Sequence, residues 1–242
     1  MGNPLLRIQN MSAWYDSEKR VLSDLSMELQ EHEVAGLIGL NGAGKTTFMK
    51  VLSGLLDSFQ AEEVCFCGYD VKFRENAFKA CRYTAFAEDN SFQYFTFREY
   101  LSYVSAAYHQ KKLDKKLDMD AVAALIQGFH FEDYTDVLLK DLSTGNKKKA
   151  FLITAFAVQP RLLLLDEPVN GLDFQSTEFL YQQIAAYKAQ GTVLFSSHIL
   201  ESITMTCDKV YVLEEGRIRQ TFEGEQIDAA KIREALHYEK DD

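Results

Sequence analysis

The chain has 242 residues, of which 47% are hydrophobic and 26% are charged, as in an ordinary water-soluble globular protein. Its formal net charge of −10 argues against a general nucleic-acid surface, which is usually basic. The longest largely apolar run, residues 150–158, is far short of the ~20 residues that cross a bilayer, and residues 1–10 lack the basic start and apolar core of a cleavable signal.

Apolar strands open the chain and lead to a glycine-rich turn. Residues 5–8 and 25–29 have the pattern of opening strands, and residues 34–38 (VAGLI) are predicted to form a buried strand. Residues 46–52 follow a helical pattern that ends near Gly54. The turn between strand and helix therefore lies at a helix N-terminus, where backbone N–H groups and the helix dipole attract anions.

The turn itself, GLNGAGKTT at residues 39–47, has the spacing of a phosphate-binding loop. Glycines at 39, 42 and 44 are expected to adopt positive φ and to let the backbone approach a polyphosphate. Lys45 can reach the β- and γ-oxygens, and Thr46 offers a hydroxyl to Mg²⁺. A glycine-rich surface turn is the alternative, but it does not explain the flanking strand and helix. The residues expected to bind nucleotide here are Gly39, Asn41, Gly42, Ala43, Gly44, Lys45, Thr46 and Thr47.

The later strands predict an α/β fold with a largely parallel sheet. Residues 63–67, followed by Gly68, alternate with period 2 and indicate a hairpin arm. Residues 162–165, 192–195 and 209–213 are apolar strands of the kind that is buried on both faces.

The middle of the chain differs from the rest. Residues 97–158 follow mainly helical patterns, and we interpret this stretch as an α-helical subdomain inserted into the core. The tail from Gly224 onward is polar with a helical pattern, and we expect it at the periphery. The chain is then one domain: a core at 1–87 and 159–223, a subdomain at 88–158 and a peripheral segment at 224–242.

Acidic residues follow one of the apolar strands. Asp166 and Glu167 come directly after residues 162–165, at the carboxyl edge where open α/β sheets bind ligands. Asp166 can hold the Mg²⁺ shell, and Glu167 can polarise a water aimed at a γ-phosphate. His198 follows another strand at the same edge and can orient the attacking water. Taken singly, an acidic turn and a capping histidine are the alternatives.

In this order the motifs resemble those of the ATP-binding cassette (ABC) ATPases over nearly the whole chain. Residues 39–47 look like the Walker A loop, and residues 162–167 look like Walker B with its catalytic glutamate. His198 falls at the switch histidine, and residues 170–173 (NGLD) are similar to the D-loop. Residues 142–146 (LSTGN) occupy the place of the signature, Leu-Ser-Gly-Gly-Gln.

The resemblance implies a P-loop NTPase core with an antiparallel β arm and an inserted α-helical subdomain, with ATP and Mg²⁺ as its ligands. Such domains work as head-to-tail dimers, in which ATP lies between the Walker A loop of one subunit and the signature of the other. An aromatic ring stacks on the adenine, and either Tyr15 or Trp14 suits that role. The resemblance assigns catalysis to Lys45, Glu167 and His198, Mg²⁺ to Thr46 and Asp166, and the neighbour's nucleotide to Ser143 and Gly145.

The signature departs from the family at two positions. Thr144 replaces a glycine and Asn146 replaces the glutamine, while Ser143 and Gly145 are retained. A β-branched side chain hinders close approach of the backbone to phosphate, so we expect a weakened signature. Residues 147–149, three lysines, are expected on a solvated helix face rather than beside phosphate.

The glutamine loop is the other departure. The family usually has a glutamine there that contacts Mg²⁺ and couples to the membrane partner. Glu88 is the nearest match, and because an acid also binds Mg²⁺ we predict it as a metal ligand, with an ordinary loop acid as the alternative.

The favoured function is an ATP-hydrolysing subunit that energises a separately encoded membrane permease, more as an exporter than as an importer, because no β-domain is appended to the core. The expected partners are permease subunits and a second ABC ATPase subunit, in a homodimer by default or a heterodimer, and no nucleic acid. The expected location is the cytoplasm, at the inner face of the cell membrane through the permease. The alternatives are a soluble ABC ATPase that acts on nucleic acid or ribosomes and a weakly hydrolysing regulatory cassette of a heterodimer.

Overall fold

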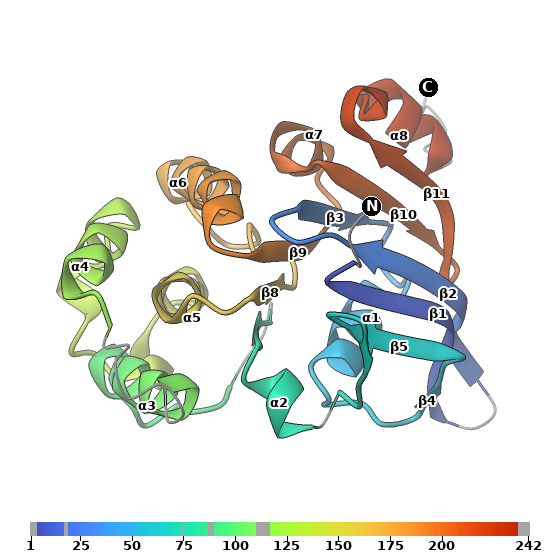
Figure 1. Ribbon diagram of the computed structural model, residues 1–242. Coiled ribbons are helices and arrows are strands. Elements are labelled where there is room, and N and C mark those ends of the chain that lie inside the picture. Colours follow the sequence, from blue (N-terminus) through green and yellow to red (C-terminus); the bar gives the residue numbers. More distant parts are fainter. Residues whose placement is uncertain (1–3, 17–18, 74, 87–89, 110–116, 237–242) are drawn as a thin grey trace.

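The protein is described from a computed structural model, which covers residues 4–16, 19–73, 75–86, 90–109 and 117–236. Two sheets and their helices form the structure (Figure 1). The larger sheet has the order β11-β10-β3-β9-β8-β7. Its strands are β3 (Val34–Ile38), β7 (Arg82–Ala85), β8 (Leu162–Leu165), β9 (Thr192–Ser197), β10 (Lys209–Glu214) and β11 (Arg217–Glu223). All neighbours in it are parallel except β10 and β11, which pair antiparallel.

Both faces of the central strands are buried, as continuous apolar runs predict. In β8, Leu162 and Leu164 belong to one hydrophobic core, while Leu163 and Leu165 belong to the other. Because successive side chains of a strand point to opposite faces, the four leucines join two cores across one sheet. The predicted α/β fold with a largely parallel sheet is thereby confirmed.

The smaller sheet is antiparallel and forms the predicted arm. It contains β1 (Leu6–Asp16), β2 (Lys19–Leu29), β4 (Phe59–Gln60), β5 (Glu63–Phe66) and β6 (Tyr69–Asp70). Cys67 and Gly68 have positive φ and make the turn between β5 and β6. The helix α1 (Lys45–Leu52) packs between this sheet and the larger one. Its Phe48 and Met49 are fully buried in the core that contains Leu162 and Leu164.

Helices dominate the middle of the chain. Between 97 and 158 the described residues form α3 (Phe97–His109), α4 (Met119–Gly128), α5 (Thr144–Val158) and two short 3₁₀ turns, Glu132–Tyr134 and Leu139–Asp141. Figure 1 shows α3, α4 and α5 together at the side away from the β arm. A four-residue helix, α2 (Asn76–Lys79), precedes β7. No helix within the described ranges is long and apolar enough to cross a bilayer.

Three helices cover the remaining face of the larger sheet: α6 (Phe174–Ala186), α7 (Leu200–Thr206) and α8 (Ala229–Ala235). A 3₁₀ turn, Tyr187–Ala189, extends α6, and another, Gly224–Gln226, follows β11. The tail is helical at α8, as expected, and it buries Ile232 and Leu236 in the core that contains Leu163 and Leu165.

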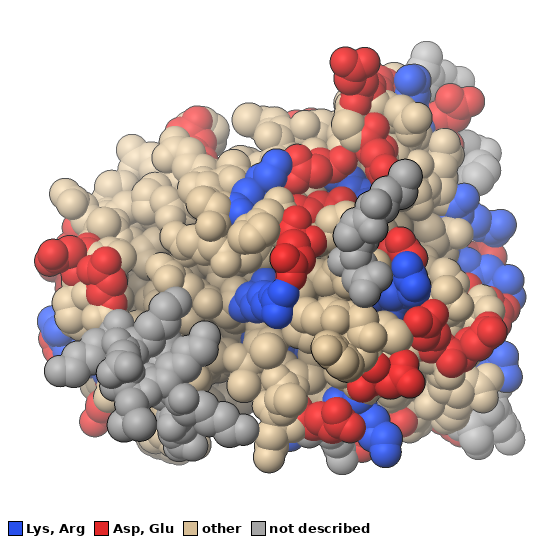
Figure 2. All heavy atoms as spheres, in the orientation of Figure 1, with Lys and Arg blue, Asp and Glu red and all other residues tan. Residues whose placement is uncertain are grey.

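Charged side chains gather over the end of the molecule formed by β1, β2, β10 and β11, where Figure 2 shows both signs interspersed. Pairs such as Arg7–Glu28 (2.6 Å) and Lys209–Glu223 (2.6 Å) connect neighbouring strands there. The strands β3, β8 and β9 run parallel, so their carboxyl ends lie at one edge of the larger sheet, and the motif residues follow these three strands.

Candidate active site

The loop between β3 and α1 has the conformation that a phosphate cradle requires. Gly42 and Gly44 have φ values of 85° and 109°, which non-glycine residues rarely adopt. A Cβ on Gly42 would meet nothing within 4 Å, so the backbone here faces open space. Gly39 does not have positive φ, which corrects our expectation. It is needed because its Cβ would lie 2.4 Å from the carbonyl oxygen of Leu213 in β10.

Lys45 begins α1, and only 6% of it is exposed. Its ammonium donates to the main-chain oxygens of Gly39 (2.6 Å) and Leu40 (3.2 Å). It also lies 3.2 Å from Oε1 of Glu167. A cation folded back over its own loop in this way can exchange these partners for phosphate oxygens when a nucleotide binds.

Thr46 and Asp166 are brought together from α1 and the end of β8. The Thr46 hydroxyl donates to Oδ2 of Asp166 (2.9 Å), and the Ser196 hydroxyl donates to Oδ1 (2.7 Å). Burial raises the pKa of Asp166, and the hydrogen bonds from Ser196 and Thr46 oppose this rise. The two hydroxyls thus stabilise a carboxylate that is 2% exposed.

The oxygens of Thr46 and Asp166 fit Mg²⁺. This ion takes oxygen ligands and is usually bound through one or two carboxylates together with substrate phosphates and water. A hydroxyl and a carboxylate oxygen 2.9 Å apart, beside a loop suited to phosphate, supply such a donor set. The third predicted ligand, Glu88, lies outside the described residues.

Glu167 and His198 are in direct contact. Oε2 of Glu167 lies 2.9 Å from Nδ1 of His198. A carboxylate only accepts hydrogen bonds, so Nδ1 is the protonated ring nitrogen. Glu167 is 8% exposed, while the His198 side chain is 38% exposed and reaches solvent. The structure therefore joins the three predicted catalytic residues in one row, Lys45, Glu167 and His198.

Tyr15 lies beside the start of α1. Its hydroxyl accepts a hydrogen bond from Thr47 (3.4 Å), and the Lys50 ammonium is 5.5 Å from the centre of its ring. The ring is 55% exposed, whereas Trp14 is only partly exposed. Of the two aromatic residues, Tyr15 is the more exposed. Asn41 is exposed in the same loop, and Ala43 is buried with its carbonyl bonded to the Gly216 N–H.

Residues 142–146 form the entry to α5. The Ser143 hydroxyl caps the helix by accepting from the Asn146 N–H (3.2 Å), and its own hydrogen can still be donated to a phosphate. Thr144 is exposed at the first helical position. A Cβ on Gly145 would lie 2.4 Å from the carbonyl oxygen of Gly171, so this glycine allows close packing against residues 170–173.

Two of the three lysines after this motif contradict the expectation of a solvated face, while Lys147 is partly exposed. Lys148 and Lys149 are each only 5% exposed. Lys148 donates to the main-chain oxygen of Glu167 (2.8 Å), and Lys149 binds Oδ2 of Asp173 (2.7 Å). Their charges are satisfied by partners far along the chain, which a local charge pattern does not reveal.

Ser196 is a site residue that sequence reasoning missed. Its hydroxyl donates to Asp166 and accepts from the Glu167 N–H (2.9 Å), so it holds both acidic residues at once. The available signal was its place directly before Ser197 and His198, at the carboxyl end of a buried strand.

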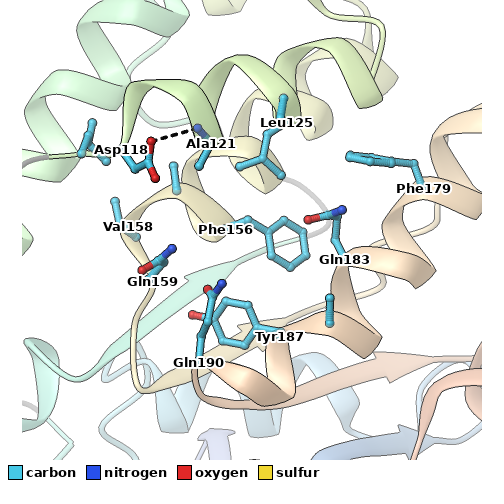
Figure 3. A pocket seen from close by; sticks show the side chains of 14 residues that line it. Asp118, Ala121, Leu125, Phe156, Val158, Gln159, Phe179, Gln183, Tyr187 and Gln190 are labelled. Carbon is cyan, nitrogen blue, oxygen red and sulfur yellow. Dashed lines mark hydrogen bonds between the residues drawn. The ribbon is translucent and has the colours of Figure 1, made fainter.

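A separate cavity of about 440 Å³ lies between α4, the end of α5 and α6 (Figure 3). The rings of Phe156, Phe179 and Tyr187 and three glutamine side chains face it. Its carboxylate, Asp118, already caps α4 by accepting from the Ala121 N–H. None of the predicted site residues that the structure describes lines it.

Comparisons with known proteins agree with this geometry. Residues 22–170 match the family described as ABC transporter. The chain is 33% identical over 231 residues to the putative ABC transporter ATP-binding protein AlbC of Bacillus subtilis (strain 168), covering 93% of this chain and 94% of that protein. It is also 33% identical over 201 residues to the Nod factor export ATP-binding protein I of Burkholderia orbicola (strain AU 1054), covering 83% and 65%.

Solved structures give the same result. A structure described as the ATP binding subunit of an ABC transporter superimposes with a TM-score of 0.82 at 26% identity, covering 97% of this chain and 95% of that one. These findings confirm the resemblance drawn from the motifs. The chain belongs to the ABC transporter family, as one of its ATP-binding subunits.

Proposed function

We propose that the protein hydrolyses ATP with Mg²⁺ and thereby energises a separately encoded membrane permease, as an exporter. The observation that carries the hydrolysis is the row of contacts from the loop through Lys45 and Glu167 to His198. The direction of transport is supported by the name of one relative, which is an export ATP-binding protein.

In the proposed reaction, Glu167 orients a water for in-line attack on the γ-phosphate and accepts its proton. His198, bonded to Glu167, holds the carboxylate in place and reaches the same phosphate. Binding of ATP draws Lys45 from Glu167 to the phosphate oxygens, which leaves the carboxylate available to the water. Thr46 and Asp166 would hold Mg²⁺, which would supply positive charge to neutralise the phosphates.

The proposal is tested with Glu167→Gln, which keeps the shape of the side chain but removes its basicity. We expect ATP binding to persist, turnover to fall by about 10²–10⁴-fold, and ATP to trap a dimer in size-exclusion chromatography. Glu178→Gln, at an exposed position of α6, is the matched control and should behave as the wild type. Unchanged turnover in Glu167→Gln would remove Glu167 from this role.

We propose a second copy of the chain, or a related cassette, as the partner that completes the nucleotide site. Ser143 and Gly145 contact neither the phosphate loop nor the acidic residues in the described part of the chain. Two large apolar side chains of the loop and D-loop region are exposed, Leu40 at 45% and Phe174 at 76%. Exposed apolar groups beside an incomplete site suit a protein partner.

For the permease we propose a groove of about 760 Å³ that runs from the metal site toward α3. Thr46 and Asp166 lie at one end of it, and aromatic side chains such as Phe86, Tyr100 and Tyr103 line the rest. A partner seated there would touch the segment just before the predicted glutamine loop. In this arrangement the protein lies at the cytoplasmic face of the membrane, and residues 88–158 form the subdomain that transmits motion to the permease.

A pull-down from detergent-solubilised membranes tests the permease. Tagged wild-type protein should recover a polytopic membrane protein, and Tyr103→Asp should reduce the recovery while ATP binding is unchanged. If wild-type protein recovers no polytopic protein, the transport proposal is contradicted, whatever the hydrolysis rate.

A further inference from the structure

We infer that Lys148 is a positioning residue for Glu167, and that it ties the helix carrying residues 143–146 to the group that activates water. This inference rests on the proposed hydrolysis at Glu167. It is carried by the hydrogen bond from the Lys148 ammonium to the main-chain oxygen of Glu167 (2.8 Å).

Glu167 has a backbone conformation that needs support. Its φ is +48°, in the left-handed region, which residues with a side chain rarely adopt. Such conformations persist only when the surroundings hold them. The side chain of Glu167 can meet Lys45 and His198 only while this backbone is kept in place.

Among the residues that the structure describes, three contacts hold the main chain of Glu167. Its N–H donates to the Ser196 hydroxyl (2.9 Å). Its carbonyl accepts from the Asn170 N–H at 3.3 Å and from the Lys148 ammonium at 2.8 Å. The bond from Lys148 is the shorter of the two on the carbonyl and is charge-assisted, which makes it the stronger restraint.

The burial of Lys148 is unfavourable unless hydrogen bonds to its ammonium offset the loss of water. The residue is 5% exposed, on a helix whose other buried positions include Phe151 and Leu152. Removing an ammonium from water is unfavourable even after the surroundings relax. An apolar side chain would fill the same space without this cost, but it could not bind the Glu167 carbonyl.

Because Lys148 lies on α5, its hydrogen bond to the Glu167 carbonyl links Glu167 to the helix that begins after Ser143. Ser143 caps this helix and Lys148 lies in its second turn, so both move with α5. Lys149 binds Asp173, so adjacent lysines hold both ends of residues 167–173. A partner nucleotide that shifts the start of α5 therefore shifts the backbone of Glu167 in the same chain.

The test compares Lys148→Met, Lys148→Arg and Lys147→Met in the full-length protein. We expect Lys148→Met to lower kcat at least about 10-fold through displacement of the base, with the KM for ATP within about threefold of wild type. Lys148→Arg keeps a charged donor and should recover most of the turnover. Lys147→Met, at the partly exposed neighbour, is the control for loss of charge.

A double variant separates positioning from general stability. If Lys148 acts through Glu167, Lys148→Met should not lower the residual turnover of Glu167→Gln further. The inference is overturned if Lys148→Met lowers the turnover of Glu167→Gln by the same factor as it lowers that of the wild type. It is also overturned if Lys148→Met alone has the kcat of the wild type. In both cases the proposed hydrolysis stands. Unchanged turnover in Glu167→Gln contradicts the proposed function itself. Should Lys148→Met not fold, Lys148→Gln takes its place in the same comparison.

Discussion

At the residue scale, the site places two acidic residues side by side and gives them different surroundings. Asp166 receives hydroxyl hydrogen bonds from Thr46 and Ser196, while Glu167 meets the cation of Lys45 and the ring of His198. Burial raises the pKa of Asp166, and the charge of Glu167 adds to the rise. Burial therefore disfavours the charged form of Asp166, and a bound divalent cation would offset this effect.

This predicts that Asp166→Asn stabilises the protein while it abolishes Mg²⁺-dependent turnover. Since the folded pKa is raised above the ordinary 3.8, the stability contribution of Asp166 is full below 3.8 and is lost as pH rises through the folded value. At pH 7 the free energy of unfolding of the variant should be about 1 kcal/mol higher than that of the wild type, which corresponds to a Tm about 2–4 °C higher. Thermal unfolding from pH 7 toward pH 4 should show this gain disappear; a variant less stable than wild type at pH 7 would contradict it.

At the scale of elements, the parts predicted from sequence are those whose signal is local. Residues 34–38 and 162–165 read as strands because every side chain in them is apolar or small, and both are strands in the structure. β7 gave no such signal because it begins with Arg82. That side chain is buried because it donates to the carbonyls of Leu52 and Ser53 at the end of α1, a long-range contact.

The same distinction applies to the site. Lys45, Glu167 and His198 were found because their spacing forms motifs, and the structure brings them together. Ser196 and Lys148 were not, because their roles exist only through contacts with residues far along the chain. The charge pattern predicted a solvated position for Lys148, because a run of lysines is normally solvated, and this prediction was wrong.

Asp173 shows how one side chain can secure two helices. It caps α6 by accepting from the Ser176 N–H (2.8 Å) and pairs with the buried Lys149 of α5 (2.7 Å). We predict that Asp173→Ala lowers the free energy of unfolding by about 1–3 kcal/mol, a range that allows for solvent around a side chain that is about half exposed. Asp173→Asn, which retains a capping oxygen, should lose less.

The pH dependence of this effect follows from the ion pair. The hydrogen bond from Lys149, together with that from the Ser176 N–H, lowers the pKa of Asp173 from 3.8. A lowered folded pKa adds stability above the ordinary value and loses it as pH falls below 3.8. Urea unfolding should therefore show a difference in the free energy of unfolding between wild type and Asp173→Asn. This difference should be constant near neutrality and should become smaller below pH 3.8. A difference independent of pH in that range would rule out the ion pair as its source.

At the scale of the whole molecule, the proposed function implies that one chain presents two separate halves of a nucleotide site. The phosphate loop, Asp166, Glu167 and His198 form one half. The other half, Ser143 to Asn146, begins a helix in the α-helical part, and the hydroxyl of Ser143 binds the Asn146 N–H. A head-to-tail pair of chains would bring each half against its complement, as the family resemblance implies.

Complementation between two inactive variants tests this arrangement. Lys45→Ala loses the phosphate loop cation, and Ser143→Asp keeps the cap of α5 but places a negative charge against phosphate. Each alone should show background turnover. In a mixture, a heterodimer contains one site with an intact loop and an intact signature, so an equimolar mix should recover roughly one quarter of wild-type turnover, given random pairing of symmetric subunits. A mixture of Lys45→Ala with Glu167→Gln restores neither site and should stay at background. Background turnover in the first mixture as well would mean that each chain completes its own site.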